Sequence, residues 1–276
     1  MKTSHTTQME VSRASIESLG ENQRPEKLQG HWVIARAGKR VLRPGGMELT
    51  LSMLGALRIG RQDRVVELAA GLGATAQRVL QSNPREFWAV EREPAAARLL
   101  EERFAGTKAR VVQADSAQTG LPAHSATVVY SEALLTMQSQ IQKERIVSEA
   151  VRLLTEDGRY GIHELCLRPD DISDQKRREI QAALSSETHN GFQPLTQAEW
   201  HALLKQHDLR VTWSAVAPMQ LLEPRRVLQD EGFIRAIGIA FRLATNGIIR
   251  ERIRAMRRLF NTYSDHIGAY SIIGEL

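Results

Sequence analysis

Between residues 64 and 165, short apolar runs alternate with longer segments in which apolar residues recur at helical spacing. The runs at 64–68, 86–90, 109–113, 127–131 and 158–165 predict strands, and the segments at 74–81, 94–104 and 138–154 predict the helices between them. Each helix is long enough for a right-handed crossover, so successive strands are expected to lie parallel. The alternation therefore predicts an α/β fold with a doubly wound, Rossmann-like sheet.

The rest of the chain is expected to surround this sheet with helices. Residues 1–24 are polar and rich in Ser and Thr, which predicts a disordered tail, and 25–60 predict an N-terminal helical cap with a turn at Arg43-Pro44-Gly45-Gly46. Residues 61–276 are assigned to the main domain. Runs at 209–216 and 267–273 bring the sheet to about seven strands, the last one antiparallel, and Gly158 is expected to cap the helix before the fifth strand. Helical insertions at about 168–195 and 223–265 are interpreted as a lid over the site.

Composition identifies the class of protein and its expected location. Of the 276 residues, 42% are hydrophobic and 25% are charged, which is typical of a globular protein with a sizeable core. No apolar stretch approaches the roughly 20 residues that cross a bilayer, and the first residues do not resemble a secretory signal. We therefore expect a cytoplasmic protein without a membrane span. The single cysteine, Cys166, excludes an internal disulfide, and no Cys or His cluster indicates a metal site.

The net charge of +5 leaves nucleic acid open as a partner. The densest basic group lies at 250–258, where five arginines alternate with apolar residues at helical spacing. That pattern is typical of a solvated helix face. A second basic group, Lys39, Arg40 and Arg43, is compatible with an anionic substrate or with solubility alone.

The strongest chemical signal is VVELAAGLGAT at residues 65–75, a buried strand that leads through a glycine-containing turn into a helix. Glycine lets the backbone approach a ligand closely, so Gly71 and Gly73 predict a binding turn. With Ala76, the turn also fits a dinucleotide fingerprint. Glu67 separates these possibilities, because its carboxylate would oppose a pyrophosphate but could accept hydrogen bonds near an ammonium group. The pattern favours S-adenosylmethionine over a dinucleotide.

Acidic residues also end the next two predicted strands. Glu91 ends the second strand, where α/β nucleotide sites place a carboxylate on the ribose hydroxyls. The third strand leads into Asp115-Ser116, where a side-chain acceptor beside a backbone N–H could bind the edge of adenine. Each acid alone is compatible with an ordinary loop position, but three acids after three successive strands favour a nucleoside site.

These pieces resemble class I S-adenosylmethionine-dependent methyltransferases, particularly the group of the ubiquinone and menaquinone methyltransferases. The resemblance covers roughly residues 60–168 and is carried by VVELAAGLGATA, WAVEREP, VVQADSAQTGLP, TVVYSEALL and RLLTEDGRYGIHEL. It implies that S-adenosylmethionine is the cofactor and S-adenosylhomocysteine the product. It also implies that Glu67 and the Gly71 turn hold the methionine part, Glu91 the ribose, and Asp115 with Ser116 the adenine. The predicted cofactor-binding set is Glu67, Ala69, Gly71, Gly73, Glu91, Arg92, Asp115, Ser116 and Ser131.

The sequence departs from this family at two places. Ala69 stands where the family usually has its first glycine, which puts the cofactor affinity in question. Residues Thr155-Glu156-Asp157-Gly158 replace the family's Pro-Gly-Gly turn before the fifth strand.

Methyl transfer requires an aligned acceptor and, where that acceptor is protonated, a base. Candidates lie after the fourth and fifth strands: Glu132, His163 and Glu164 for catalysis, with Glu132 ranked before His163. Helix capping or a core hydrogen bond is an equal alternative for Glu132, and a satisfied buried ring is the alternative for His163. The predicted substrate-binding residues are Tyr130, Gln138, His189 and Asn190, where packing explains Tyr130 and solvation explains His189 equally well.

The favoured function is methyl transfer to a small molecule, because the extra helices could enclose a ligand-sized pocket. A nucleic-acid (RNA) methyltransferase is the alternative suggested by the charge. The chain has no Asn-Pro-Pro-Tyr-like motif, Cys166 lies on the fifth strand, not after the fourth, and aromatic residues amount to only 5%. A non-catalytic S-adenosylmethionine-binding protein and a nicotinamide-dependent oxidoreductase also stay open, as do the acceptor atom and the oligomeric state.

Overall fold

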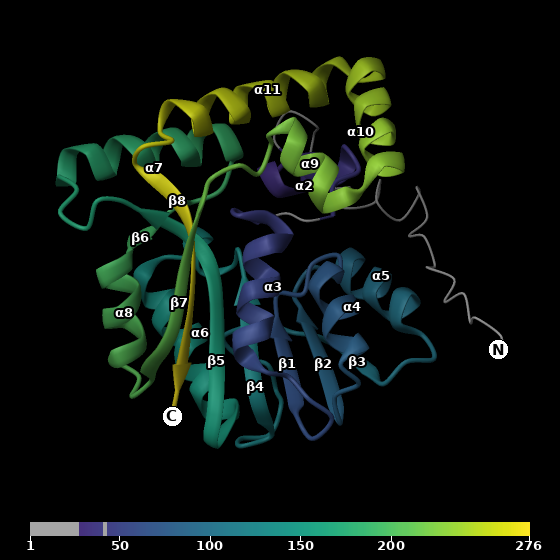
Figure 1. Ribbon diagram of the computed structural model, residues 1–276, viewed down its shortest axis with the longest axis vertical. Coiled ribbons are helices and arrows are strands. Elements are labelled where there is room, and N and C mark those ends of the chain that lie inside the picture. The colour runs from purple at the N-terminus through teal and green to yellow at the C-terminus, as the bar shows by residue number, and fades with distance from the viewer. Residues whose placement is uncertain (1–27, 41–42) are drawn as a thin grey trace.

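Eight strands form one sheet in the order β3-β2-β1-β4-β5-β8-β7, with the short strand β6 paired to β5 (Figure 1). The computed structural model describes residues 28–40 and 43–276, so the tail predicted at 1–24 lies outside the described residues. The strands are β1 (Arg64–Leu68), β2 (Glu86–Glu91), β3 (Ala109–Gln113), β4 (Ala126–Glu132), β5 (Leu154–Leu167), β6 (Leu195–Thr196), β7 (Arg210–Pro218) and β8 (Ile267–Glu275). Strands β3, β2, β1, β4 and β5 pair in parallel, whereas β8 is antiparallel to both β5 and β7.

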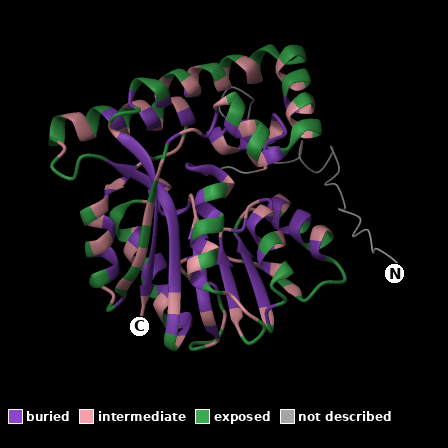
Figure 2. Ribbon diagram, in the orientation of Figure 1, coloured by how far each residue is buried: buried purple, intermediate pink, exposed green. Residues whose placement is uncertain are grey.

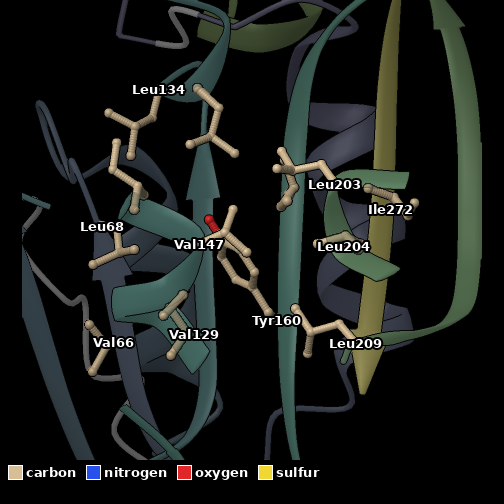
Figure 3. Close-up of a cluster of buried hydrophobic side chains, with 14 of the residues drawn as sticks. Val66, Leu68, Val129, Leu134, Val147, Tyr160, Leu203, Leu204, Leu209 and Ile272 are labelled. Atoms are coloured by element: carbon tan, nitrogen blue, oxygen red, sulfur yellow. The ribbon is translucent and has the colours of Figure 1, made fainter. Parts of the chain in front are cut away.

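Helices cover both faces of the sheet. One face carries α6 (Gln140–Leu153) and α8 (Gln197–Lys205), and the other carries α3 (Gly46–Leu57), α4 (Ala74–Gln81) and α5 (Pro94–Phe104). Alternate side chains of a strand point to opposite faces of the sheet, so a buried strand needs helices on both faces. In β1, Val66 and Leu68 enter the core beneath α6 and α8, which we call the first core, and Val65 enters the core beneath α3, α4 and α5, which we call the second core. Figure 3 shows part of the first core, where Val147 of α6 lies near Tyr160 of β5, and Leu203 and Leu204 of α8 lie near Ile272 of β8.

A third group of helices lies across the carboxyl ends of the parallel strands, along the top of Figure 1. It comprises α2 (Gly30–Arg36), α7 (Asp174–Thr188), α9 (Pro224–Glu231), α10 (Phe233–Thr245) and α11 (Gly247–Thr262). We call these five helices the helical layer. Apolar residues of α2, α7 and α11 share a core with Leu165, Leu167 and Ile267 at the ends of β5 and β8. Figure 2 shows buried residues on the sheet side of the layer and exposed residues on its outer side.

The sheet confirms the predicted fold class, including the antiparallel last strand. The two-residue strand β6 was not predicted. The expectation that Gly158 caps α6 is wrong, because α6 ends at Leu153 and β5 begins at Leu154. Gly158 lies within β5, where a Cβ atom would stand 2.7 Å from the Thr155 carbonyl oxygen. The glycine is therefore required by close backbone packing.

The turn predicted at residues 43–46 separates α2 from α3. Gly45 and Gly46 have φ angles of 69° and 63°, and a Cβ at Gly45 would lie 2.8 Å from Ala269. After this turn, α3 packs on a face of the sheet through Met53 and Leu57. In the described ranges, no helix is both long and apolar enough to cross a membrane.

Candidate active site

A cavity of about 380 Å³ lies between the carboxyl ends of the strands and the helical layer. Loops after β1, β2, β3 and β4 line one part of it, and residues of α2, α11 and the segments around 190 and 220 line the other. Ligands of open α/β sheets bind at this edge, because every parallel strand delivers a loop there.

The turn after β1 borders the cavity through Ala69 and Gly71. Both residues have left-handed backbones, with φ angles of 56° and 55°. A Cβ atom at Gly71 would meet nothing nearer than the Ala69 carbonyl oxygen at 4.0 Å, so the turn is open toward the cavity. Gly73, by contrast, does not line the cavity, and a Cβ there would lie 2.7 Å from Leu100 and 2.8 Å from Phe104. Packing against α5 therefore explains Gly73.

Glu91 at the end of β2 lines the cavity and also holds the neighbouring turn. Its carboxylate accepts hydrogen bonds from the backbone N–H groups of Gly71 at 2.8 Å and Glu93 at 2.9 Å. Burial raises the pKa of Glu91 even though these N–H groups oppose that shift. The turn after β1 and the end of β2 therefore meet at the Glu91 carboxylate.

Asp115 and Ser116 after β3 lie at the same part of the cavity, together with Arg92. Asp115 accepts a hydrogen bond from the Ala117 N–H at 2.8 Å and lies 3.5 Å from the Arg92 guanidinium. Six predicted cofactor residues line the cavity: Ala69, Gly71, Glu91, Arg92, Asp115 and Ser116. Glu67, Gly73 and Ser131 do not, and the Ser131 hydroxyl pairs with Tyr160 at 2.9 Å inside the sheet core.

Glu67 is buried below the turn, where burial and the Glu132 charge raise its pKa to about 8. Tyr130 is fully buried nearby, and its hydroxyl partly opposes that increase. Neither Glu67 Oε2 nor the Tyr130 hydroxyl has a partner within hydrogen-bond geometry in the described part of the chain. The two groups are therefore close but imperfectly aligned, and an acceptor oxygen is left unsatisfied beneath the turn.

Glu132 is the centre of a buried polar network at the end of β4. Its carboxylate lies 3.0 Å from Arg43 Nε and 2.9 Å from His163 Nδ1, and it accepts hydrogen bonds from the Thr50 and Thr75 hydroxyls. Burial raises the pKa of Glu132, but Arg43, His163 and Thr50 outweigh it and lower the pKa to about 2. Glu132 lines the cavity as a fixed anion, which makes it a weak proton acceptor near neutral pH.

His163 and Glu164 both have their polar atoms engaged. His163 Nε2 donates to the Pro44 carbonyl oxygen at 2.6 Å, and the residue does not line the cavity. Glu164 does line it, but its carboxylate accepts four hydrogen bonds, from the backbone N–H groups of residues 134–136 and from the Thr136 hydroxyl. Its pKa is raised by burial. The bonds of Glu164 hold the short helix η2 (Leu135–Met137) beside the site.

The part of the cavity under the helical layer is mainly apolar. Its lining includes Trp32, Met137, Phe192, Met219, Leu221, Met256 and Phe260. Of the predicted substrate residues, Gln138 and Asn190 line the cavity, whereas Tyr130 is buried in the sheet core and His189 lies exposed at the end of α7. The structure brings a residue to this part that the sequence did not single out, His31 of α2.

His31 Nδ1 lies 3.3 Å from Asn190 Nδ2, and the His31 ring contacts Trp32 with centroids 4.5 Å apart. Burial lowers the pKa of His31 to about 4, so the ring is neutral near pH 7. Its only sequence signal is its place in the predicted N-terminal cap.

The thiol of Cys166 is buried and close to the Leu167 carbonyl oxygen at 3.1 Å. Burial raises the pKa of Cys166 to about 12, so it is not a nucleophile of this site. Among the described residues, no group of three or more His, Cys, Asp or Glu side chains could hold a metal ion.

A family model described as a methyltransferase domain matches residues 65–158. The chain carries a methyltransferase domain. The match confirms the predicted methyltransferase domain, and the matched residues include the Gly71 turn, Glu91, Asp115 and Glu132.

Most of the chain is also similar to other proteins. Over 243 residues it is 26% identical to an uncharacterized protein of Haemophilus influenzae, covering 86% of this chain and 92% of that protein. Three solved structures share the fold. The MccD protein has a TM-score of 0.66 and 16% identity, over 84% of this chain and 99% of that chain. Phosphoethanolamine N-methyltransferase 2 of Haemonchus contortus, in complex with phosphomonomethylethanolamine and S-adenosylhomocysteine, has a TM-score of 0.68 and 13% identity, over 96% of this chain and 60% of that chain. Geranyl diphosphate methyltransferase, in complex with GPP and sinefungin, has a TM-score of 0.59 and 14% identity, over 83% of this chain and 77% of that chain.

Proposed function

We propose that the protein transfers the methyl group of S-adenosylmethionine to a small-molecule acceptor bound under the helical layer. One observation carries this proposal: a single cavity has the Gly71 turn, Glu91 and Asp115 at one part and an apolar lining with His31 and Asn190 at the other. A cofactor and an acceptor bound in these two parts would lie next to each other, and proximity is the main requirement of methyl transfer.

The residues present fit the cofactor. Glu91 would bind the ribose hydroxyls, and Asp115 with Ser116 would bind the adenine edge. The open side of Gly71 leaves room for the methionine part. Glu67 lies beneath this turn and outside the cavity lining, and its unsatisfied Oε2 would attract the ammonium group from there. Two of the similar structures contain S-adenosylhomocysteine or sinefungin, which supports this assignment. When bound, S-adenosylmethionine supplies an electrophilic methyl group.

The acceptor would be uncharged and largely apolar, because its part of the cavity is lined mostly by apolar side chains. The apolar lining is compatible with the ubiquinone and menaquinone methyltransferase group. We propose that the protein belongs to this subfamily and acts in the cytoplasm. Glu132 would act through its fixed negative charge. His31 is neutral and borders the cavity, so it would hydrogen-bond the acceptor's polar group.

Titration calorimetry of the purified protein with S-adenosylmethionine, S-adenosylhomocysteine and NAD tests this proposal. We expect binding of the first two only, and we expect Glu91→Ala to weaken it at least about tenfold, which corresponds to the loss of about 1.4 kcal/mol of hydrogen bonding to the ribose. Glu86→Ala is the matched control, because Glu86 begins the same strand at the opposite end and does not line the cavity.

An unchanged dissociation constant for Glu91→Ala would remove the ribose assignment. Binding of NAD without S-adenosylmethionine would overturn the proposed function itself.

A further inference from the structure

Helix α10 presents an apolar face to solvent. Phe233, Ile234, Ile237 and Phe241 are 70%, 87%, 54% and 68% exposed. Their spacing places them on one side of the helix, and we call these four residues the apolar stripe. Other exposed large apolar side chains on the sheet and its covering helices, such as Ile141 and Val216, occur one to an element.

The apolar stripe is not a face of α10 that should pack against the rest of the protein, because the opposite side of α10 already does so. Ile239 on that side is 7% exposed and lies against Gly38, where a Cβ atom would stand 3.3 Å from its side chain. Arg242 donates to the Ala37 carbonyl oxygen at 3.5 Å, which also joins α10 to the segment after α2. The stripe is therefore an outward surface of a helix that the fold already holds in place.

The charge of the surrounding helices is strongly positive. Together α10 and α11 contain seven arginines and one acidic residue, Glu251. In a helical wheel, Arg235 and Arg242 fall toward the packed side of α10, with Ile239. The exposed arginines of this pair of helices are Arg254 and Arg258 of α11. An exposed apolar stripe on a pair of helices with a large excess of arginine is typical of a surface that lies in a membrane interface.

We propose that α10 binds the surface of an anionic lipid bilayer, with the apolar stripe at the boundary of headgroups and acyl chains. Charge complementarity decides between a bilayer and a second copy of the chain. Two copies in contact through the apolar stripe would bring two positively charged pairs of helices together, each with seven arginines and one glutamate, whereas an anionic headgroup layer would neutralise this charge. This inference does not depend on the proposed methyl transfer.

Co-sedimentation of the full chain with lipid vesicles tests the proposal. We expect the protein to sediment with phosphatidylcholine vesicles that contain phosphatidylglycerol, to sediment less with phosphatidylcholine alone, and to be released by salt. The double variant Ile234→Ser with Ile237→Ser should reduce the binding constant by about tenfold or more, because two apolar side chains no longer enter the interface.

The matched control is Ile141→Ser with Val216→Ser, which removes two equally exposed apolar side chains (65% and 62%) from other parts of the fold. We expect this control to bind vesicles like the unchanged protein. The proposal fails if the unchanged protein does not sediment with anionic vesicles, or if both double variants lose binding equally. It also fails if the chain is a dimer that only the Ile234→Ser, Ile237→Ser variant dissociates, since the stripe would then bind a second copy.

Discussion

Burial shifts the pKa values of two residues at the site in opposite directions. It raises the pKa of Glu67 to about 8 and lowers that of His31 to about 4, because in each case the charged form loses its hydration. Near neutral pH, the free protein therefore holds Glu67 mostly protonated and His31 neutral. A cationic ligand next to Glu67 would reverse the first of these states, whereas His31 stays available as a hydrogen-bonding group.

The lowered pKa of His31 makes a prediction about stability. Since the folded pKa of about 4 lies below the ordinary value of 6.5, the unfolded chain binds more protons between these values. The free energy of unfolding should therefore fall as pH decreases from 6.5 toward 4, with a loss of about 2 kcal/mol from His31 by pH 5. Urea unfolding of the unchanged protein and of His31→Gln at pH 7 and pH 5 measures this. If both proteins lose the same free energy of unfolding, the pKa of His31 is not lowered in the folded protein.

The site also shows which single residues a sequence can reveal. Gly71, Glu91 and Asp115 were predictable because each follows a strand with a clear apolar run, and parallel strands end at one edge. The role of Glu132 was less predictable, because its partners Arg43 and Thr50 come from a segment more than 80 residues earlier. For His31 the sequence gave only its place in the predicted N-terminal cap, since the packing of α2 over the strands is what brings it to the cavity.

Among the structural elements, strands and helices with strong periodicity were predicted nearly to the residue, as in α4 and α5. Elements fixed by tertiary contacts were not. Strand β6 has two residues and exists because it pairs with the end of β5. Strand β5 begins at Leu154, which was predicted to be the last residue of the preceding helix, because Leu154 already pairs with Ala126 of β4.

The turn between β1 and α4 contains two glycines with separate functions, and this makes a prediction. Gly71→Val should abolish binding of S-adenosylmethionine, because its side chain would project into the cavity and because valine strains the turn at a φ of 55°. Since the side chain would clash with no residue, the protein should stay folded. Gly73→Ala should instead lower the stability, since its methyl group would meet Leu100 and Phe104. Thermal unfolding and calorimetric titration of both variants separate the effects. Equal cofactor affinity of Gly71→Val and the unchanged protein would contradict the binding role of the turn.

At the scale of the whole molecule, the helical layer is joined to the sheet by its own apolar core and closes the cavity from above. Helix α7 contributes Ile180 and Leu184 to that core, and the hydroxyl of Tyr263, the residue after α11, donates to Glu179 of α7 at 3.0 Å. The other side of α7 is largely exposed. The helix is thus attached along one side only, and this is compatible with the predicted lid at 168–195.

The lid makes a prediction about hydrogen exchange. Connections that leave the carboxyl ends of the strands line the ligand cavity, and the segment after β5 contributes Asn190 and Phe192 to its lining. A ligand that contacts those residues should stabilise α7, so S-adenosylhomocysteine together with an acceptor should selectively slow exchange at residues 170–192. The amides of β1 and β4 are the internal control, because they are buried in the sheet with or without a ligand. If residues 170–192 of the free protein already exchange as slowly as those strands, the segment is fixed structure, and the acceptor must enter the cavity by another route.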